Sequence, residues 1–245
     1  MKKICIIIHL YYTDLWDEIS SYLDNIDYEY DLHISLTKDN EIENLEFLNK
    51  IKDLDNVYTY VLDNIGLDIG PFLIVFNEIV KKELEYDLLL KLHTKKGLHG
   101  NRQPRMGETW RNQLIVPILN SKERVNEIIN IFNTSGDIGL IGSKKWLVDP
   151  NHVGFHYNIN YIKFYKNYFD LKTEYKNIVF IGGTIFWSRF NIYKDFFIKH
   201  DMITVYNELE RGAFTDSQAP KRTHALERIL AMIVYDYGQK IIGIE

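Results

Sequence analysis

Six positively charged side chains lie close together in the middle of the sequence, around the segment His93-Thr94-Lys95-Lys96. They are Lys91, Lys95, Lys96, Arg102, Arg105 and Arg111, and the only acid among them is Glu108. The chain as a whole carries a net charge of −5, so this region reverses the sign of its surroundings. Lys and Arg donors can neutralise a diphosphate, and His93 could bond to the same group. The alternatives are a solvated basic surface and, for His93, a packed core position.

A carboxylate suited to general-base chemistry occurs near the C-terminus, in the sequence His224-x-x-Glu227-Arg228. The i, i+3 and i+4 spacing puts the three side chains on one face of a helix, beside an apolar stripe. A carboxylate in that position could accept the proton of an attacking hydroxyl group. Asp216, in the preceding loop, is a second candidate carboxylate. The alternative for Glu227 is a surface position in which it pairs with a neighbouring arginine.

Two glycine-bearing segments could bring a ligand close to the backbone. In Asn64-x-Gly66-x-Asp68 the glycine suits positive φ, and the two polar side chains could hold hydroxyl or amide groups. Backbone N–H groups at the start of the following helix would favour an anion. In Gly182-Gly183-Thr184-Ile185-Phe186-Trp187 two glycines interrupt a strand, which costs stability unless something approaches the backbone closely. An ordinary loop turn and a β-bulge with core aromatics are the respective alternatives.

Alternating strand-like and helix-like segments must position these groups. Apolar, β-branched runs predict strands at 3–10, 30–36, 57–62, 86–92, 138–141, 178–186 (with a kink at the glycines) and 240–244. Helical spacing predicts helices at 14–23, 42–51, 72–80, 110–119, 123–132 and 224–235. Thr13 and Thr223 are the expected N-caps of the first and last helix. The aromatic segment 151–175 shows no clear period.

This order of segments indicates a single-domain α/β protein with a mostly parallel, Rossmann-like sheet flanked by helices and joined by right-handed crossovers. Ligands of such sheets bind at the carboxyl ends of the strands. The turn at 64–70 and the basic tip at 93–96 both follow predicted strands, so both are expected at that edge. The glycine-rich segment 97–107 is predicted to be a loop that could close over a ligand.

Composition limits the class of protein. A chain of 245 residues with 46% hydrophobic and 26% charged residues is typical of a soluble globular protein. The acidic balance argues against a general nucleic-acid binder. The single cysteine, Cys5, cannot form an internal disulfide, and no apolar stretch approaches the roughly 18 residues that a membrane span requires. A cytoplasmic location is therefore expected.

Aromatic residues make up 14% of the chain. Compositional bias explains most of them, with a surface that stacks on sugars or bases as the alternative. Phosphate-loop, dinucleotide-binding and nucleophile-elbow motifs and cysteine-based zinc spacings do not occur. His152 and His156 are four residues apart, but Pro150 and Gly154 argue against a helix there, so no metal site is predicted.

Six segments, in this order, resemble the rhamnan synthesis F family of bacterial polysaccharide-assembly proteins. They are HLYYTDLWDEI, NIGLDIGPF, LKLHTKK, the pair Trp110-Arg111, GGTIFWSR and HALER, and they run from His9 to Arg228. The resemblance implies a glycosyltransferase that moves a sugar, often rhamnose, from a nucleotide diphosphate donor to a growing glycan.

The layout is also similar to the glycosyltransferase A-type fold, which implies roles by position. A nucleotide-binding half would span about 1–96 and an acceptor half about 97–245. The residues implied around the nucleotide are His9, Tyr11, Asn64, Gly66 and Asp68. His93 and Lys95, with Lys96 beside them, would occupy the place of the acidic pair that binds a metal ion in that fold. Glu227 would stand where inverting members keep the base.

The hypothesis is an inverting glycosyltransferase that builds a bacterial surface polysaccharide without a metal ion. A cationic tip would repel Mg²⁺ or Mn²⁺ and would itself offset the charge of the diphosphate. No cofactor is then required beyond the nucleotide-sugar substrate, and the acceptor would be a glycan or a lipid-linked glycan. Lys95, Lys96, Arg102, Arg105 and Arg111 would stabilise the leaving group, and Gly182, Gly183, Phe186 and Trp187 would shape the sugar pocket.

Three alternatives remain open from the residues. The first is a retaining or metal-using transferase in which Asp68 or Asp216 coordinates the ion. The second is a non-catalytic nucleotide- or glycan-binding module of a larger synthase. The third, a phosphate-ester hydrolase, lacks the paired acids that hold its metals. Peripheral association with a membrane assembly complex at the inner face of the membrane is compatible with the first two.

Overall fold

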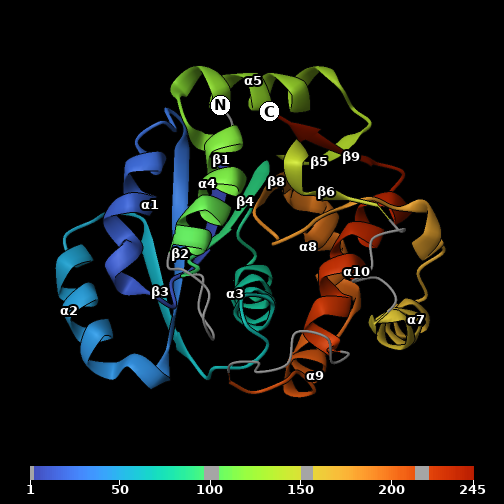
Figure 1. Cartoon of the computed structure of the whole chain (residues 1–245), viewed down its shortest axis with the longest axis horizontal. Helices are drawn as coiled ribbons and strands as arrows, with labels where there is room; N and C mark the ends of the chain where they lie inside the picture. The colour runs from blue at the N-terminus through green and yellow to red at the C-terminus, as the bar shows by residue number, and fades with distance from the viewer. Residues whose placement is uncertain (1–2, 97–104, 150–156, 213–220) are drawn as a thin grey trace.

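One seven-stranded sheet forms the centre of the protein, in the order β3-β2-β1-β4-β8-β5-β9 (Figure 1). The computed structural model describes residues 3–96, 105–149, 157–212 and 221–245, and only the backbone of residues 105 and 106. The strands are β1 (Lys3–His9), β2 (Glu29–Thr37), β3 (Val57–Leu62), β4 (Leu88–His93), β5 (Ile138–Ser143), β8 (Phe186–Arg189) and β9 (Lys240–Ile244). All neighbours are parallel except β8, which is antiparallel to both β4 and β5. The predicted mostly parallel α/β sheet is confirmed.

Helices flank this sheet, and a small second sheet lies beside it. The helices are α1 (Trp16–Leu23), α2 (Glu41–Ile51), α3 (Ile69–Lys81), α4 (Arg105–Leu119), α5 (Lys122–Thr134), α7 (Ile159–Tyr168), α8 (Phe190–Lys199), α9 (Met202–Asn207) and α10 (Arg222–Asp236). The short strands β6 (Leu147–Val148) and β7 (Phe180–Ile181) pair antiparallel. In Figure 1, α1 and α2 lie beside the first strands, and α7 to α10 gather on the opposite side, with β4 and α3 between them. No helix in the described ranges is both long and apolar enough to cross a bilayer.

Strand β1 explains why the predicted site lies where it does. Its residues from Ile4 to Ile8 are all buried, as expected for a parallel strand covered by helices on both faces. The register with β4 places His9 directly opposite His93. The carboxyl ends of these two strands are therefore neighbours at the ligand-binding edge of the sheet.

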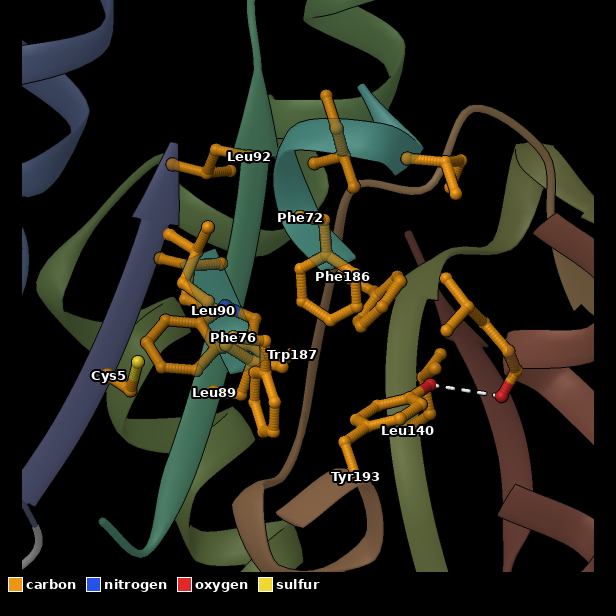
Figure 2. Close-up of a cluster of buried hydrophobic side chains, with 14 of the residues drawn as sticks. Cys5, Phe72, Phe76, Leu89, Leu90, Leu92, Leu140, Phe186, Trp187 and Tyr193 are labelled. Atoms are coloured by element: carbon orange, nitrogen blue, oxygen red, sulfur yellow. Dashed lines mark hydrogen bonds between the residues drawn. The ribbon is translucent and has the colours of Figure 1, made fainter. Parts of the chain in front are cut away.

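Aromatic side chains fill the space between β4, β8 and the helices α3 and α8 (Figure 2). Phe72 and Phe76 pack with ring centroids 5.5 Å apart, and the hydroxyl of Tyr193 donates to the carbonyl oxygen of Leu230 at 3.1 Å. Trp187 belongs to this core. Its side chain is fully buried and its indole N–H donates to the Ile118 carbonyl at 3.2 Å. The structure thus places Trp187 in the core, away from the pocket described below.

Several element boundaries differ from those predicted. The unassigned segment 151–175 contains α7, and α8 and α9 were not predicted. The strand predicted at 178–186 divides into β7 and β8, which belong to different sheets, and the kink between them turns the chain from one sheet to the other. Residues 97–104 of the predicted loop lie outside the described residues, and its last residues, 105–107, begin α4.

The two predicted threonine caps are wrong. Thr13 opens a short 3₁₀ helix (Thr13–Leu15) that precedes α1, and no side chain caps either start. Thr223 lies inside α10. The carboxylate of Glu210 accepts the first N–H groups of that helix, from Arg222 at 2.5 Å and Thr223 at 3.1 Å. A carboxylate at the start of a helix accepts the same free backbone N–H groups that a threonine cap would accept. Its negative charge also interacts favourably with the positive end of the helix dipole.

Two buried histidines predict how stability depends on pH. Burial lowers the pKa of His9 and of His33 to about 4, so both stay neutral in the folded protein. The unfolded chain takes up protons on both as pH falls below about 6.5, which favours unfolding. Each histidine should therefore remove about 2–3 kcal/mol of stability between about pH 7.5 and about pH 4.5. Urea unfolding at the two pH values measures this loss.

The matched variant His33→Gln separates this effect from the titration of carboxylates. Glutamine can bond to the hydroxyls of Tyr60 and Tyr86, which contact the two ring nitrogens of His33. The variant should lose about 2–3 kcal/mol less than the parent protein over the same pH range. An equal loss in both proteins would show that His33 does not titrate as expected.

Candidate functional site

A pocket of about 240 Å³ opens at the carboxyl end of β4. Its walls come from the turn before α3, the end of β4, the start of α4, the β6–β7 pair and the first half of α10. The candidate site residues predicted from sequence that line it are Asp68, His93, Lys95, Gly182, Gly183, His224 and Glu227, and Arg228 of the same helical motif lines it too. The fold thus brings together Asp68 and Glu227, which are 159 positions apart in the sequence.

An ion pair between a buried lysine and a partly buried aspartate lies next to this pocket. Lys91, in the middle of β4, is 1% exposed and its Nζ lies 2.6 Å from Oδ2 of Asp68. Lys91 also donates to the hydroxyl and the carbonyl oxygen of Thr184, at 2.9 and 3.2 Å, and the Thr184 hydroxyl donates to the same Asp68 oxygen at 2.5 Å. All three donors of the ammonium group are therefore used. The network joins the start of α3, strand β4 and the turn before β8.

The charges around Asp68 decide its protonation. Burial by itself would raise the pKa of this carboxyl group, but the facing His93 and Lys91 and the bonds from Lys91 and Thr184 outweigh burial and lower the pKa below its usual range. Asp68 is therefore ionised at neutral pH. Since Lys91 and Thr184 both bond to Oδ2, that oxygen is occupied within the protein.

His93 is buried, yet it reaches the pocket. Its Nε2 lies 2.7 Å from the carbonyl oxygen of Gly183, so this nitrogen carries the proton and donates it. Burial lowers the pKa of His93 below 6.5, which keeps the ring neutral at pH 7. The ring also faces Trp110, at a centroid distance of 5.7 Å. The side chain is packed, as the core interpretation predicted, and it also lines the site, while its bond to a diphosphate stays a prediction.

The glycine turn before β8 has an unusual backbone. Gly183 has φ +89°, and the next residue, Thr184, has φ +52°. A β-branched residue in the left-handed region is strained, and such strain is common at functional sites. A Cβ on Gly183 would lie 2.4 Å from Trp110. The close approach that the paired glycines predicted is therefore made by the indole ring of Trp110.

Glu227 reaches the pocket from α10. Its Oε1 accepts the backbone N–H of Gly183 at 2.7 Å, and its Oε2 accepts from Nη1 of Arg228 at 2.5 Å. The side chain is 14% exposed. A carboxylate has about four acceptor positions, so each oxygen can still accept one more hydrogen bond. Glu227 therefore pairs with Arg228, as the alternative interpretation of its sequence predicted, and it also lines the pocket.

His224 lies one helical turn before Glu227 and also lines the pocket. Burial lowers its pKa below 6.5, while the nearby Glu227 acts in the opposite direction. The imidazole is therefore mainly neutral at pH 7 and could accept a proton. Its backbone carbonyl receives a hydrogen bond from Nη1 of Arg228 at 2.6 Å.

The predicted cation cluster separates in the folded chain. Lys95 lines the pocket, with its Nζ 4.3 Å from the centroid of the Trp110 ring. Lys96 pairs with Asp14. Arg111 is 5% exposed and forms a two-pronged ion pair with Glu18 at 2.6 and 2.9 Å. Sequence spacing could not reveal these partners, because they come from α1 and the segment before it.

Of the other predicted cations, Arg102 and the side chain of Arg105 lie outside the described residues. The same holds for Asp216, His152 and His156. Among the fully described cations of this cluster, Lys95 lines the pocket, and Lys91 contacts Asp68 and Thr184 in the lining. Lys91 is already paired with Asp68.

The turn that contains Asn64 and Gly66 supports the site indirectly. The side-chain amide of Asn64 donates to Oδ2 of Asp39 at 2.8 Å, and the N–H of Gly66 donates to the carbonyl of Glu210 at 2.8 Å. Neither residue lines the pocket. Gly66 has φ +69°, so the predicted positive φ is present, and the turn orients Asp68 at the start of α3.

His9 and Tyr11 lie at the end of β1 but are not part of the pocket lining. Nδ1 of His9 lies 3.1 Å from the hydroxyl of Ser35, and its side chain is buried. The ring of Tyr11 contacts that of Tyr12 edge to face at 4.8 Å. The implied nucleotide-binding role of this strand end stays a prediction.

Sequence reasoning missed Thr184, Trp110 and Trp146 as pocket residues, and it counted Lys91 only as one of several cations. One signal for Lys91 was present, since it is a single charge inside the apolar run of β4, and such a charge requires a buried partner. The two tryptophans approach each other in space, at 5.8 Å, from segments 36 residues apart. In the described part of the chain, no group of three or more His, Cys, Asp and Glu residues is placed to hold a metal ion.

Comparison with known proteins matches nearly the whole chain to one family. The family described as "Rhamnan synthesis protein F" matches residues 1–239. Comparison with curated proteins gave no match. Among solved structures, 4-diphosphocytidyl-2C-methyl-D-erythritol synthase from Anaerococcus prevotii has a TM-score of 0.46 and 12% identity, over 100% of this chain and 88% of that one.

Proposed function

This chain belongs to the rhamnan synthesis protein F family, and we propose that it is a glycosyltransferase that uses a nucleotide-diphosphate sugar. The observation that supports the proposal best is the shared pocket of Glu227 and Lys95. A carboxylate that can accept a proton and a cation that can receive a leaving diphosphate are the two groups that sugar transfer requires at one centre. The substrates would be a rhamnose-type donor and a glycan or lipid-linked glycan acceptor.

Glu227 would act as the general base of an inverting reaction. It would take the proton of an acceptor hydroxyl while that oxygen forms a bond to the anomeric carbon. The bond from the anomeric carbon to the diphosphate oxygen breaks at the same time, and the diphosphate leaves with the bonding electrons. The bond from the Gly183 N–H holds the carboxylate toward the turn that lines the pocket, which supports this assignment.

Lys95 would stabilise the charge that develops on the leaving diphosphate. It follows β4 directly, is exposed, and lines the pocket opposite α10. The neutral His93 beneath it does not add charge of its own, and the charge of Lys91 is balanced by Asp68. Arg228 also lines the pocket but is paired with Glu227, so Lys95 is the described lining cation that remains available to a phosphate group.

Transfer without a metal ion is part of the proposal. Asp68 and Glu227 are the acids among the described pocket residues, and Oδ2 of Asp68 already accepts bonds from Lys91 and Thr184. A carboxylate used in this way is a poor ligand for Mg²⁺, which requires oxygen ligands in a strict octahedral arrangement. The rival version uses a metal ion, and activity that disappears in excess EDTA would favour it.

Nucleotide binding tests the function directly. We expect one of UDP, dTDP and GDP to raise the melting temperature by several degrees, with and without EDTA, because ligands that bind only the folded state stabilise it by mass action. Lys95→Ala should weaken that nucleotide's affinity about tenfold or more, since it removes a charge-assisted bond. Lys52→Ala is the matched control, because Lys52 follows α2 and lies at the opposite edge of the sheet.

Two outcomes would contradict the proposal. If none of the three nucleotides stabilises the protein, a nucleotide-sugar transferase is excluded. If a nucleotide binds and neither sugar transfer nor donor hydrolysis follows, the chain is a binding module of a larger synthase. The ion pair of Glu227 with Arg228 is the observation that favours this second reading.

A further inference from the structure

Helix α7 carries aromatic side chains on its outer face. Tyr161, Phe164 and Tyr168 are spaced by three and four residues and therefore lie on one side of the helix. Phe164 and Tyr168 are each 45% exposed, and Tyr161 is half-buried. We call these three residues the aromatic face of α7. Large apolar groups held together in solvent in this way mark an interaction surface more often than single exposed residues do.

The core of the protein does not require this face. The neighbouring side of α7 buries Ile162 and Tyr165, and the helix packs against α10. On the outer side the rings of Phe164 and Tyr168 are nearly parallel, at 17°, with centroids 6.1 Å apart. Both side chains remain 45% exposed, so each offers part of its ring to solvent.

Polar groups flank the rings. The guanidinium carbon of Arg222 lies 5.0 Å from the Tyr161 centroid and 5.6 Å from the Phe164 centroid. Nη1 of Arg222 lies 3.1 Å from Oε2 of Glu208, and both side chains are partly exposed. Flat apolar surfaces beside fixed donors and acceptors suit a sugar, which has apolar C–H faces and hydroxyl groups at its rim.

The aromatic face is continuous with the candidate site. Arg222 is the first residue of α10, and the next residue, Thr223, lines the pocket. Glu210 binds the backbone N–H groups of both residues, so their positions are fixed relative to each other. A chain of sugars that enters the pocket beside the start of α10 would therefore pass over the rings of α7.

We propose that the aromatic face of α7 binds the acceptor glycan, several sugar units away from the unit that receives the transferred sugar. This inference rests on the proposed transferase function. The ligand is a neutral, rhamnose-containing oligosaccharide whose sugar rings stack on Phe164 and Tyr168, while Arg222 and Glu208 bond to its hydroxyl groups.

The charges near α7 favour a neutral glycan over an anionic membrane. Arg222 pairs with Glu208 and Lys166 pairs with Glu174 at 3.0 Å, so Lys163 is the one cation of α7 without an ion pair among the described residues. A helix that binds anionic lipid carries an excess of Lys and Arg on its polar face. A stable dimer formed through the aromatic face would bury a larger apolar surface than three rings usually provide.

Binding of oligorhamnosides of graded length tests the proposal. Calorimetry with oligosaccharides of about two to about eight units should show that affinity for the wild-type protein rises with length. The double variant Phe164→Ala/Tyr168→Ala should bind the longest ligands about tenfold or more weakly, and the shortest ligands unchanged. Phe164→Tyr, which keeps the ring, should retain wild-type affinity. Ile198→Ala is the matched control, because Ile198 is 62% exposed on a different helix.

The same experiments show what would overturn the inference. Equal affinity of wild type and double variant for long ligands would do so, as would the absence of oligosaccharide binding in a wild-type protein that binds nucleotide. Ring-dependent binding to vesicles of anionic lipid, or a dimer that the double variant abolishes, would assign the surface to another partner. Nucleotide binding is measured separately. Oligosaccharide binding without nucleotide binding would therefore reject the transferase function, while glycan binding by the aromatic face of α7 would still hold.

Discussion

Glu227→Gln is expected to lower sugar transfer by a factor of about 10² to 10⁴ while nucleotide binding is preserved. The amide is close in size to the carboxylate, and its carbonyl oxygen can still accept the Gly183 N–H that Oε1 accepts at 2.7 Å. It cannot take a proton from the attacking hydroxyl, so the loss should appear in kcat. Transfer is measured as nucleotide diphosphate released in the presence of acceptor.

Two controls make the result interpretable. The amide cannot pair with Arg228 as the carboxylate does, so the melting temperature and nucleotide affinity of the variant must be measured beside its activity. His224→Asn removes a second group in the pocket that could accept a proton, the one that lies on the same helix as Glu227. Near-normal turnover of Glu227→Gln would remove Glu227 from the catalytic role, and inactivity of His224→Asn alone would transfer the role to His224.

Lys91→Met is expected to destabilise the protein by about 3–5 kcal/mol, the second large effect. The substitution keeps the length of the apolar stem but leaves Asp68 without the ammonium group 2.6 Å away. A buried carboxylate without its partner keeps the cost of desolvation and loses the compensating attraction. Urea unfolding of the wild type and the variant at neutral pH measures the difference.

A double variant separates the ion pair from simple packing. Lys91→Met/Asp68→Leu removes both charges, and it should recover most of the stability that the single variant loses, because buried ion pairs contribute little relative to apolar residues of similar size. Thr184 would lose a partner in both variants, which limits full recovery. A single variant that loses less than about 1 kcal/mol would show that Asp68 is solvated or neutral in the folded protein.

The strands were predictable because their signal is local. The apolar runs of β3 and β9 gave their observed ends, and β1 and β5 differ by one or two residues. Burial selects the residue types of β1 and β5, whereas β3 is an edge strand with no buried residue, and its signal is the β-branched and aromatic residues that favour strands. Helix α7 was not predicted, although its aromatic residues Tyr161, Phe164, Tyr165 and Tyr168 have the three- and four-residue spacing of one helix side, with Asn160, Lys163 and Asn167 on the other side.

The candidate site was predictable only in part. Asp68, His93 and Lys95 could be assigned to the carboxyl edge of the sheet because each follows a predicted strand or begins a predicted helix. Glu227 could be assigned to a helix face from its spacing with His224. Lys96 and Arg111 resembled Lys95 in sequence, yet they pair with Asp14 and Glu18, because charge pairing depends on which segments meet in space.

By itself, the sequence determined the strand and helix order, the mostly parallel sheet, the edge at which ligands are expected and the family to which the chain belongs. These properties depend on residue types and short spacings, which local sterics and burial translate directly into structure. Only the tertiary structure decided which charges neutralise each other. Lys91 meets Asp68 and Thr184 across 23 and 93 residues, and Glu227 meets the Gly183 backbone across 44, through contacts that no local pattern encodes.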